Sequence, residues 1–188
     1  SAYAKQGGMN RRKAGEDFYF INKIISLGDY GEVNNIRVIP SPRVSDRVPF
    51  GTGRAIQEKI DGVRNLDLTY SFQIFSALKS WLTLVIEEAV YEYDEFPEFI
   101  KLYIEKEYWD RTLHMIQSNS ASPKAFINRF FRTFDAFWIL KFVHYIKENH
   151  ISDTSLALNS NCLLNEFNIS SKNTLLELLC EFRKIDKQ

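Results

Sequence analysis

Apolar side chains recur roughly every three or four residues over most of the chain after residue 69, which is the spacing of amphipathic helices. The first such stretch runs from Tyr70 to Tyr91 and carries its apolar face on Phe72, Phe75, Leu78, Leu82, Val85 and Ile86. The second runs from Phe96 to about Gln117, with Pro97 near its first turn, where a proline is tolerated. Both stretches are therefore predicted to be long helices.

A third helix is predicted from Ser122, which can cap it, and Pro123, which fits the first helical position, to about Asn149. Its main apolar stripe consists of Phe126, Phe130, Phe134, Phe137 and Leu140. Further apolar positions widen this stripe and consist of Phe131, Trp138, Phe142 and Tyr145. A helix with so wide an apolar face is expected at the centre of the core. A short helix from Thr174 to about Lys184 closes the chain.

The beginning of the chain predicts shorter and more mixed elements. They are a helix from Glu16 to Leu27 that Gly28 stops, a strand over 32–39 before Pro40, a loop over 41–53, and a helix from Arg54 to about Ile60 that ends at Gly62. All eight glycines lie between residues 7 and 62. Residues 63–188 therefore have few sharp turns and are expected to be helices joined by polar loops.

This change in composition places a domain boundary near residues 62–68. We expect one domain over residues 1–62 and a second over residues 63–188. The predicted fold class is mainly α, with a C-terminal helical bundle preceded by a small α/β segment.

Charge and composition narrow the class of protein. Lysine plus arginine and aspartate plus glutamate both number 24, so the formal net charge is zero and no overall field attracts nucleic acid. No run reaches the roughly 20 apolar residues of a membrane-spanning helix. Cys162 and Cys180 lie in apolar helical settings and are interpreted as core thiols in a reducing compartment. We therefore expect a cytoplasmic protein, including the inner face of the membrane as a location.

Two adjacent carboxylates, Glu16 and Asp17, lie in the first turn of a predicted helix, just after the basic residues 11–13. The partial positive charge at a helix N-terminus stabilises a carboxylate in its charged form. A charged and fixed carboxylate is what a general base needs to remove a proton from an attacking hydroxyl. Ordinary helix capping explains the same pair, and on periodicity alone capping is favoured.

Residues 1–10 (SAYAKQGGMN), followed by Gly15-Glu16-Asp17, resemble the acceptor-side signature of family-2 glycosyltransferases with the GT-A fold. In that family a helix leads into a Gly-Gly turn, here Gly7-Gly8, and a Glu-Asp pair opens the next helix. The resemblance implies that Asp17 is the catalytic base of an inverting transfer from a nucleotide-sugar to a hydroxyl acceptor. Glu16 would then bind or orient that hydroxyl, and Gly7 and Gly8 would help to form the substrate site.

The resemblance extends over about residues 1–56, because residues 38–53 are similar to the segment that follows in a bacterial subgroup of these proteins. The family's nucleotide-binding half, with its Asp-x-Asp metal site, is expected before this segment. The intact enzyme is therefore expected to use Mg or Mn, while this segment holds no cofactor and is inactive alone. The Gln-x-x-Arg-Trp motif of processive members is absent, which argues against a polysaccharide synthase.

Arg43, Arg47 and Arg54 lie in or beside a loop rich in glycine and proline. Guanidinium groups suit bidentate contacts with phosphate oxygens, so one hypothesis is that Arg43 or Arg47 reaches the donor pyrophosphate. A solvated basic loop is the equal alternative. The three histidines, His114, His144 and His150, lack metal-ligand spacing and are interpreted as structural.

The sequence also leaves open a second function, different from that of a transferase. The chain could be a non-enzymatic helical domain that binds other proteins, in which the Glu16-Asp17 pair is only a cap. If the transferase interpretation is right, residues 1–60 lack the sheet on which they normally pack. They are then expected to be frayed, or to bury Phe18 and Phe20 by self-association.

Overall fold

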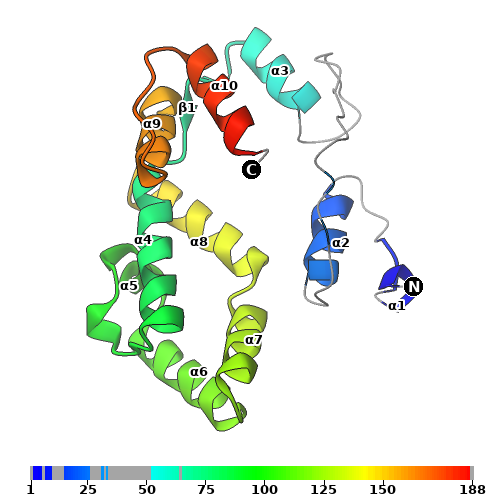
Figure 1. The fold of residues 1–188 in the computed structure, drawn as a ribbon, viewed down its shortest axis with the longest axis vertical. Coiled ribbons are helices and arrows are strands. Elements are labelled where there is room, and N and C mark those ends of the chain that lie inside the picture. Colours follow the sequence, from blue (N-terminus) through cyan, green and yellow to red (C-terminus); the bar gives the residue numbers. More distant parts are fainter. Residues whose placement is uncertain are drawn as a thin grey trace. The chain divides into compact units, whose positions relative to one another are not determined.

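The computed structural model describes residues 2–5, 7–9, 15–25, 31, 33, 52–63 and 65–186, and Figure 1 shows their fold. The chain divides into two compact units. Unit 1 consists of residues 1–66 together with 182–188, and unit 2 consists of residues 67–181. The division between residues 66 and 67 falls within the 62–68 stretch where the glycines end. Apart from Val33, which is not in a strand, the strand expected over 32–39 lies outside the described residues, as do the stop at Gly28 and residues 41–51 of the loop expected over 41–53. The last two residues of that loop, Thr52 and Gly53, belong to a helix, which therefore begins two residues earlier than predicted.

Unit 2 is mainly helical, as predicted. In chain order its elements are β1 (Leu68–Thr69), α4 (Phe72–Leu82), a π-helical turn (Thr83–Glu87), a 3-10 turn (Tyr93–Glu95), α5 (Glu98–Tyr103), α6 (Lys106–Ser118), α7 (Pro123–Thr133), α8 (Ala136–Asn149), β2 (Thr154–Ser155), α9 (Leu156–Glu166) and α10 (Leu175–Ile185). Helix α10 continues past the end of the unit. The two short strands pair antiparallel, with Leu68 opposite Ser155 and Thr69 opposite Thr154.

The helix predicted over 70–91 is shorter than expected at both ends. Ser71 caps α4, because its hydroxyl accepts a hydrogen bond from the backbone N–H of Gln73 at 3.3 Å. At the other end the helix widens into the π-helical turn and stops before Ala89, whose φ is +54°. The left-handed conformation of Ala89 ends the helix where the sequence contains no glycine or proline.

The second and third predicted helices are each divided in two. Helix α5 ends at Ile104, whose carbonyl accepts a hydrogen bond from the Tyr93 hydroxyl at 2.6 Å. Burial, followed by the negative charge of Glu107, raises the pKa of Tyr93, so the hydroxyl remains a donor at neutral pH. Helix α7 ends before Asp135, whose Oδ1 caps α8 by accepting from the N–H groups of Phe137 and Trp138.

The core of unit 2 is built around Trp81 of α4, which is fully buried. Its indole ring lies 5.1–6.1 Å, centroid to centroid, from the rings of Phe96, Trp109, Phe130, Phe134 and Trp138. Phe96 follows the 3-10 turn, and the other rings come from α6, from α7 and its end, and from α8. The side chain of Trp81 therefore connects α4 with four other parts of the unit. Aromatic pairs at these distances stabilise a core beyond the area they bury.

The buried face of α4 differs from the predicted one. It consists of Ile74, Leu78 and Trp81 and continues into the π-helical turn with Val85. Phe75, which the sequence places on the apolar face, is 43% exposed. Of the predicted apolar face, Leu78 and Val85 are buried, and Leu82 and Ile86 are partly buried and pack against the core.

The phenylalanine stripe of the third predicted helix is core only in part. Phe130, Phe134 and Phe142 are buried, but Leu140 is 44% exposed. The break at Phe134–Asp135 changes the direction of the chain, so a stripe drawn along one straight helix does not continue on the same face of α8. The start at Ser122-Pro123 is confirmed: the Ser122 hydroxyl accepts from the Ala125 N–H at 3.2 Å.

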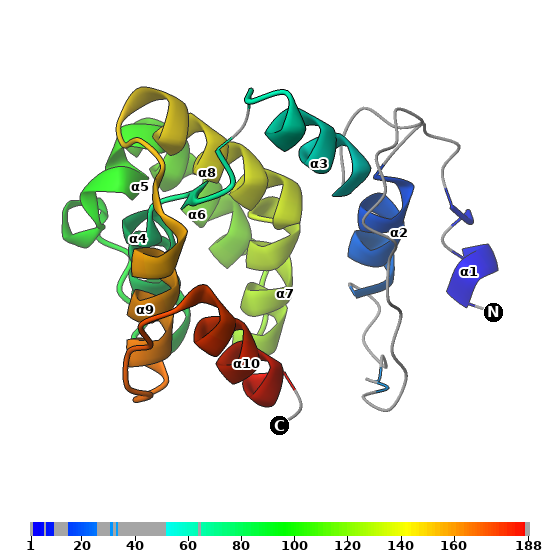
Figure 2. The same ribbon diagram turned by 90° about the horizontal axis from the view of Figure 1, so that it is seen from above.

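Helix α9 contains Cys162, whose surroundings the sequence indicated to be helical without giving bounds, and it lies against the N-terminal end of α4 (Figures 1 and 2). The nearly buried amide of Asn159 holds this contact. Its Oδ1 accepts from the backbone N–H of Phe72 at 2.8 Å, and its Nδ2 donates to Thr154 Oγ1 at 2.6 Å. Cys162 in α9 is half-buried and Cys180 in α10 is exposed, and both are free thiols, so the expectation of two core cysteines is wrong for Cys180.

Unit 1 contains α1 (Ala2–Lys5), α2 (Glu16–Ile25) and α3 (Thr52–Ile60) among its described residues. The predicted end of α3 is confirmed, because Gly62 adopts φ +68° and its N–H donates to the Lys59 carbonyl at 3.1 Å. Helix α2 begins at Glu16 as predicted, but none of its side chains is buried.

Candidate functional site

The Gly7-Gly8 pair forms a left-handed turn at the end of α1. Both residues have positive φ, +70° and +69°, which glycine adopts without steric cost. The Gly8 N–H donates to the Tyr3 carbonyl at 2.9 Å and the Gly7 N–H donates to the Ala4 carbonyl at 3.1 Å. These two bonds are those of a Schellman motif, so the turn that the sequence predicts is present.

Tyr3 connects this turn to α2. A Cβ atom on Gly8 would lie 3.1 Å from atoms of the Tyr3 ring, so the buried glycine is needed for the ring to pack there. The other side of the contact is Phe20 of α2, whose ring centroid is 5.3 Å from that of Tyr3. The Gly-Gly turn and the helix that carries Glu16 and Asp17 are therefore joined through one aromatic pair.

Glu16 and Asp17 open α2 after Gly15, which has φ +73° and whose carbonyl accepts from the Tyr19 N–H at 3.2 Å. Asp17 is exposed, and its Oδ1 accepts a hydrogen bond from the backbone N–H of Phe18 at 2.8 Å. Glu16 is half-buried. An exposed carboxylate held by a backbone donor at a helix N-terminus can serve either as a cap or as a base that a hydroxyl substrate reaches.

Of the three predicted arginines, Arg54 is the one within the described residues, and it is not brought to this site. Arg54 lies in α3 and forms an ion pair with Glu58 one turn later, with Nε and Oε1 2.8 Å apart. The structure shows no contact between Arg54 and Asp17. Arg43 and Arg47 lie outside the described residues, so their proposed contact with a donor pyrophosphate stays a prediction. Within the described ranges, no three histidine, cysteine or acidic side chains converge as metal ligands would.

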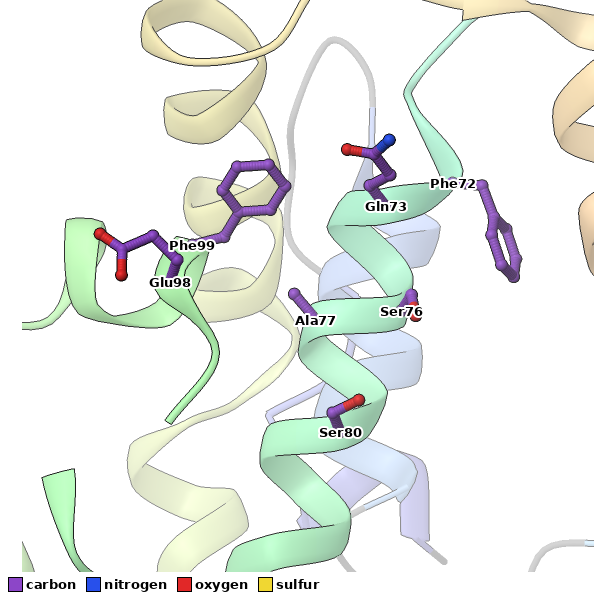
Figure 3. Close-up of a pocket in the computed structure, with 7 residues that line it drawn as sticks. All are labelled: Phe72, Gln73, Ser76, Ala77, Ser80, Glu98 and Phe99. Atoms are coloured by element: carbon purple, nitrogen blue, oxygen red, sulfur yellow. The ribbon is translucent and has the colours of Figure 1, made fainter. Parts of the chain in front are cut away.

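Unit 2 contains a groove of about 360 Å³ between α4 and α5 that the sequence did not predict (Figure 3). Its lining consists of Phe72, Gln73, Ser76, Ala77, Ser80, Glu98 and Phe99. The serines lie one helical turn apart beside the small Ala77, which leaves room along α4. The small residues Ser76, Ala77 and Ser80 are visible in the sequence, but the groove depends on how α4 and α5 pack.

A second pocket, of about 280 Å³, lies between α6 and α7. Met115, Ile116 and Asn119 of the α6 end line one side, and Arg129, Arg132 and Thr133 line the other. Sequence analysis missed it because α6 and α7 were each part of a longer predicted helix. The available signal was the absence of any acidic residue between Arg111 and Phe134.

His144 takes part in a polar cluster at the surface of unit 2. Its Nε2 lies 3.0 Å from the Tyr70 hydroxyl, and the Lys147 ammonium lies 4.8 Å from the centre of the Tyr70 ring. Lys147 also pairs with Asp153 at 2.8 Å. These contacts fix the chain that leads into α4 to the side of α8, which agrees with a structural interpretation of this histidine.

None of the helices in the described ranges has the length and hydrophobicity of a membrane span. Comparison of the whole chain with protein-family models, with curated proteins and with solved structures produced no match.

Proposed function

We propose that residues 1–62 are the C-terminal, acceptor-side part of an inverting, nucleotide-sugar-dependent glycosyltransferase with the GT-A fold. The observation that supports this most is the placement of Asp17. It is exposed in the first turn of α2, and α2 is joined through Tyr3 and Phe20 to a left-handed Gly7-Gly8 turn. This order of turn, helix and first-turn carboxylate is the one that the family signature implies.

In this reaction the Asp17 carboxylate accepts the proton of the acceptor hydroxyl as the hydroxyl oxygen attacks the anomeric carbon of the donor. The bond between that carbon and the diphosphate oxygen breaks, and the nucleoside diphosphate leaves with the electron pair. Attack opposite the leaving group inverts the anomeric configuration. Glu16, the neighbour of Asp17 in the first turn, would accept a hydrogen bond from the acceptor and orient it.

A divalent metal in such an enzyme neutralises the negative charge of the departing diphosphate. The 188 residues contain no Asp-x-Asp motif, and the described part of the chain holds no group of three metal-ligating side chains. The described residues of this chain therefore do not fit a metal site, and their proposed role is limited to the acceptor. The donor and its metal are assigned to another part of a longer protein.

The exposed apolar side chains of α2 support the proposal that another domain packs against this helix. Ile21 and Ile25 lie one turn apart and are 53% and 52% exposed. Burying a large aliphatic side chain stabilises a fold by about 1.5–3 kcal/mol, so two isoleucines on one exposed face indicate a surface that is covered in the complete protein. A sheet of the preceding domain is the proposed cover.

A helical interaction domain is the second candidate function, and it concerns unit 2. Leu175, Leu176 and Leu179 are exposed along one side of α10. Apolar side chains at this spacing favour contact with another helix. In this alternative Asp17 only stabilises the start of α2, and its removal leaves no catalytic defect.

Two experiments test the proposed function in sequence. The first is to determine the gene sequence upstream of the codon for Ser1, where we expect an in-frame domain with an Asp-x-Asp after a strand. The second replaces Asp17→Asn in the full-length protein and measures release of the nucleoside diphosphate from a panel of nucleotide-sugars. Loss of a general base is expected to slow turnover by about 100-fold or more.

Asp94→Asn is the matched control, because Asp94 is also an exposed acid in a first helical turn but lies in unit 2. It is expected to leave turnover unchanged. Donor binding by the Asp17→Asn protein should also be unchanged, since the base contacts the acceptor. Full activity of Asp17→Asn would refute the assignment of the base.

A further inference from the structure

Charge in unit 2 is strongly segregated, although the chain has no net charge. Residues 87–110 carry only Lys101 and Lys106 against a set of acids consisting of Glu87, Glu88, Glu92, Asp94, Glu95, Glu98, Glu105, Glu107 and Asp110. Residues 111–134 carry no acid, and their basic residues are Arg111, Lys124, Arg129 and Arg132. The second half of α6 and the whole of α7 therefore form a positively charged segment, which we call the basic hairpin.

Two of these arginines line the pocket between α6 and α7. Arg129 and Arg132 lie three residues apart on α7, so their side chains leave the helix on the same side, with Cβ atoms about 5–6 Å apart. Both are exposed. Met115 and Ile116 of α6 form the facing apolar wall of the pocket. The guanidinium groups are thus presented beside a concave surface and not on an open helix face.

Among the described residues, the same two arginines have no carboxylate partner, although acids pair with many other cations of the unit. Every residue from 67 to 181 is described, and within this range ion pairs join Lys79 to Glu166, Lys101 to Glu98, Lys106 to Asp110, Lys147 to Asp153 and Lys172 to Glu181. Asp135 is the acid nearest to Arg132 in sequence, but its Oδ1 accepts from the N–H groups that begin α8.

Asn119 and Thr133 are the other polar residues of the pocket, and their side-chain donors already form hydrogen bonds within the protein. The Asn119 amide Nδ2 donates to the Met115 carbonyl at 2.8 Å, and the Thr133 hydroxyl donates to the Arg129 carbonyl at 3.1 Å. Both bonds satisfy carbonyls near helix C-termini. The donors that remain available to a ligand in this pocket are therefore those of the two guanidinium groups.

We propose that this pocket binds a phosphate group. Each guanidinium presents a planar fork of N–H donors that matches two phosphate oxygens, and two forks together match a group with more than one negative charge. Ligand pockets span roughly 300–1,000 Å³, so a pocket of about 280 Å³ suits a phosphate or diphosphate group and not a whole nucleotide. The group can belong to a free phosphorylated compound or to the headgroup of a lipid.

This inference does not depend on the proposed glycosyltransferase function, because it concerns residues of unit 2 only. Its test uses the whole 188-residue chain and needs no enzymatic activity. Binding of inorganic pyrophosphate is measured by isothermal titration calorimetry. Sedimentation with vesicles of phosphatidylglycerol, compared with vesicles of phosphatidylcholine, provides the lipid arm of the experiment.

The test variant is the double substitution Arg129→Gln and Arg132→Gln, which keeps side-chain length at two exposed positions. The matched control is Arg111→Gln with Lys124→Gln, which removes the same charge from the basic hairpin outside the pocket. Hydrogen bonds to charged groups are lost in the test variant, so we expect its affinity to fall about tenfold per arginine. The control is expected to change affinity by less than about threefold, through general electrostatics alone.

Loss of pyrophosphate binding in the test variant alone would support the proposal with a free phosphorylated ligand. Loss of vesicle binding in the test variant alone, without pyrophosphate binding to the wild-type chain, would support it with a lipid headgroup as the source. Equal weakening in both variants would overturn the proposal, because binding would then follow net charge and not the pocket. Absence of binding to both probes by the wild-type chain would overturn it as well.

Discussion

The two units differ in what holds them together. Unit 2 is organised by long-range packing, with Trp81 at the centre of a cluster of aromatic rings from several helices. In the described part of unit 1 the contacts are local: the turns at Gly8 and Gly62, the Tyr3–Phe20 ring contact and a helix, α2, that buries no side chain. Unit 2 therefore has the core of an independent domain, whereas among the described residues of unit 1 the helix α2 contributes no buried side chain to a core.

The largest effect is expected at Trp81. Trp81→Ala removes a fully buried indole from the aromatic cluster, so the free energy of unfolding should fall by about 3–5 kcal/mol. Ile21→Ala in the exposed face of α2 is the matching change in unit 1 and should cost less than about 0.5 kcal/mol. Urea unfolding followed by far-UV circular dichroism measures both. A large loss for Ile21→Ala would mean that α2 is packed, and the comparison would fail.

A smaller and local effect is expected at Gly8. Gly8→Ala places a Cβ atom 3.1 Å from the Tyr3 ring in a left-handed residue, which costs about 1–2 kcal/mol. Amide hydrogen exchange should become faster in α1 and α2 and remain unchanged in α4. Gly31→Ala is the control, because a Cβ atom there meets nothing within 4 Å. Faster exchange in α4 would show that the stabilities of the two units are coupled.

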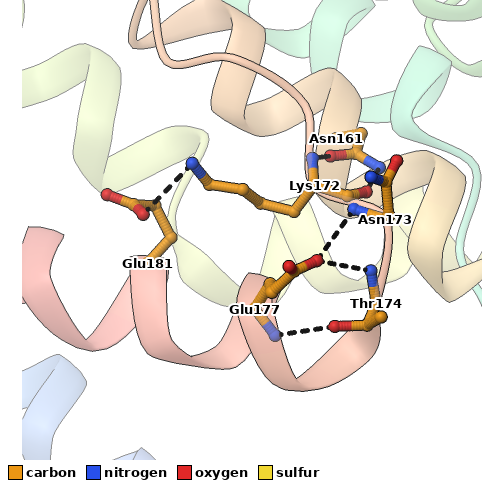
Figure 4. Close-up of polar contacts among 6 residues, drawn as sticks. All are labelled: Asn161, Lys172, Asn173, Thr174, Glu177 and Glu181. Atoms are coloured by element: carbon orange, nitrogen blue, oxygen red, sulfur yellow. Dashed lines mark hydrogen bonds and ion pairs between the residues drawn. The ribbon is translucent and has the colours of Figure 1, made fainter.

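The smallest effect is expected at Glu177, in the first turn of α10 (Figure 4). Its carboxylate accepts from the backbone N–H groups of Thr174 at 3.0 Å and Asn173 at 3.1 Å, and its own N–H donates to the Thr174 hydroxyl at 3.2 Å. This is a capping box. Hydrogen bonds from Thr174, first of all the one from its backbone N–H, lower the pKa of Glu177.

A lowered pKa means that the folded chain prefers the charged carboxylate. The resulting stabilisation is present above the ordinary glutamate pKa and is lost as the pH falls through the lowered value. Glu177→Gln should therefore reduce the dependence of stability on pH in the acid range, while Glu148→Gln, at an exposed position of α8, should not. Thermal unfolding over a series of acid pH values provides the measurement, and an identical pH dependence for Glu177→Gln and the wild-type chain would contradict it.

Starts and ends of helices that depend on one or two neighbouring residues could be predicted from the sequence. Ser122 and Pro123 begin α7, and Gly62 ends α3, because capping and left-handed turns are local chemistry. The same holds for the Gly7-Gly8 turn and for the start of α2 at Glu16, which are the described backbone elements of the candidate site.

Breaks inside a continuous apolar pattern could not be predicted in the same way. The helical periodicity continues through Ile104 and Phe134, where no glycine or proline interrupts it. The break at Ile104 is held by the hydroxyl of Tyr93, which lies in the 3-10 turn before α5 and outside the helical window in which periodicity is read. Asp135 was a visible signal, since aspartate is a preferred cap, but the phenylalanine pattern around it favoured one long helix.

The pocket of the basic hairpin shows the limit of sequence reasoning for sites. Arg129 and Arg132 are visible as neighbours on one helix, but the apolar wall from Met115 and Ile116 depends on how α6 and α7 pack. Arg43 and Arg47, for which the sequence leaves a phosphate contact and a solvated basic loop as equal alternatives, lie outside the described residues, and that prediction stays open. A basic side chain becomes a candidate ligand only when its acidic neighbours are known, and these are set by tertiary structure.

The aromatic cluster also determines what light can report about this protein. The chain has three tryptophans, Trp81, Trp109 and Trp138, and all of them belong to the cluster in unit 2. The indole of Trp81 lies 6.0 Å from that of Trp109 and 5.3 Å from that of Trp138, close enough for their excited states to couple. Tryptophan emission is therefore a spectroscopic label of unit 2, built into the sequence, because residues 1–66 and 182–188 contain no tryptophan.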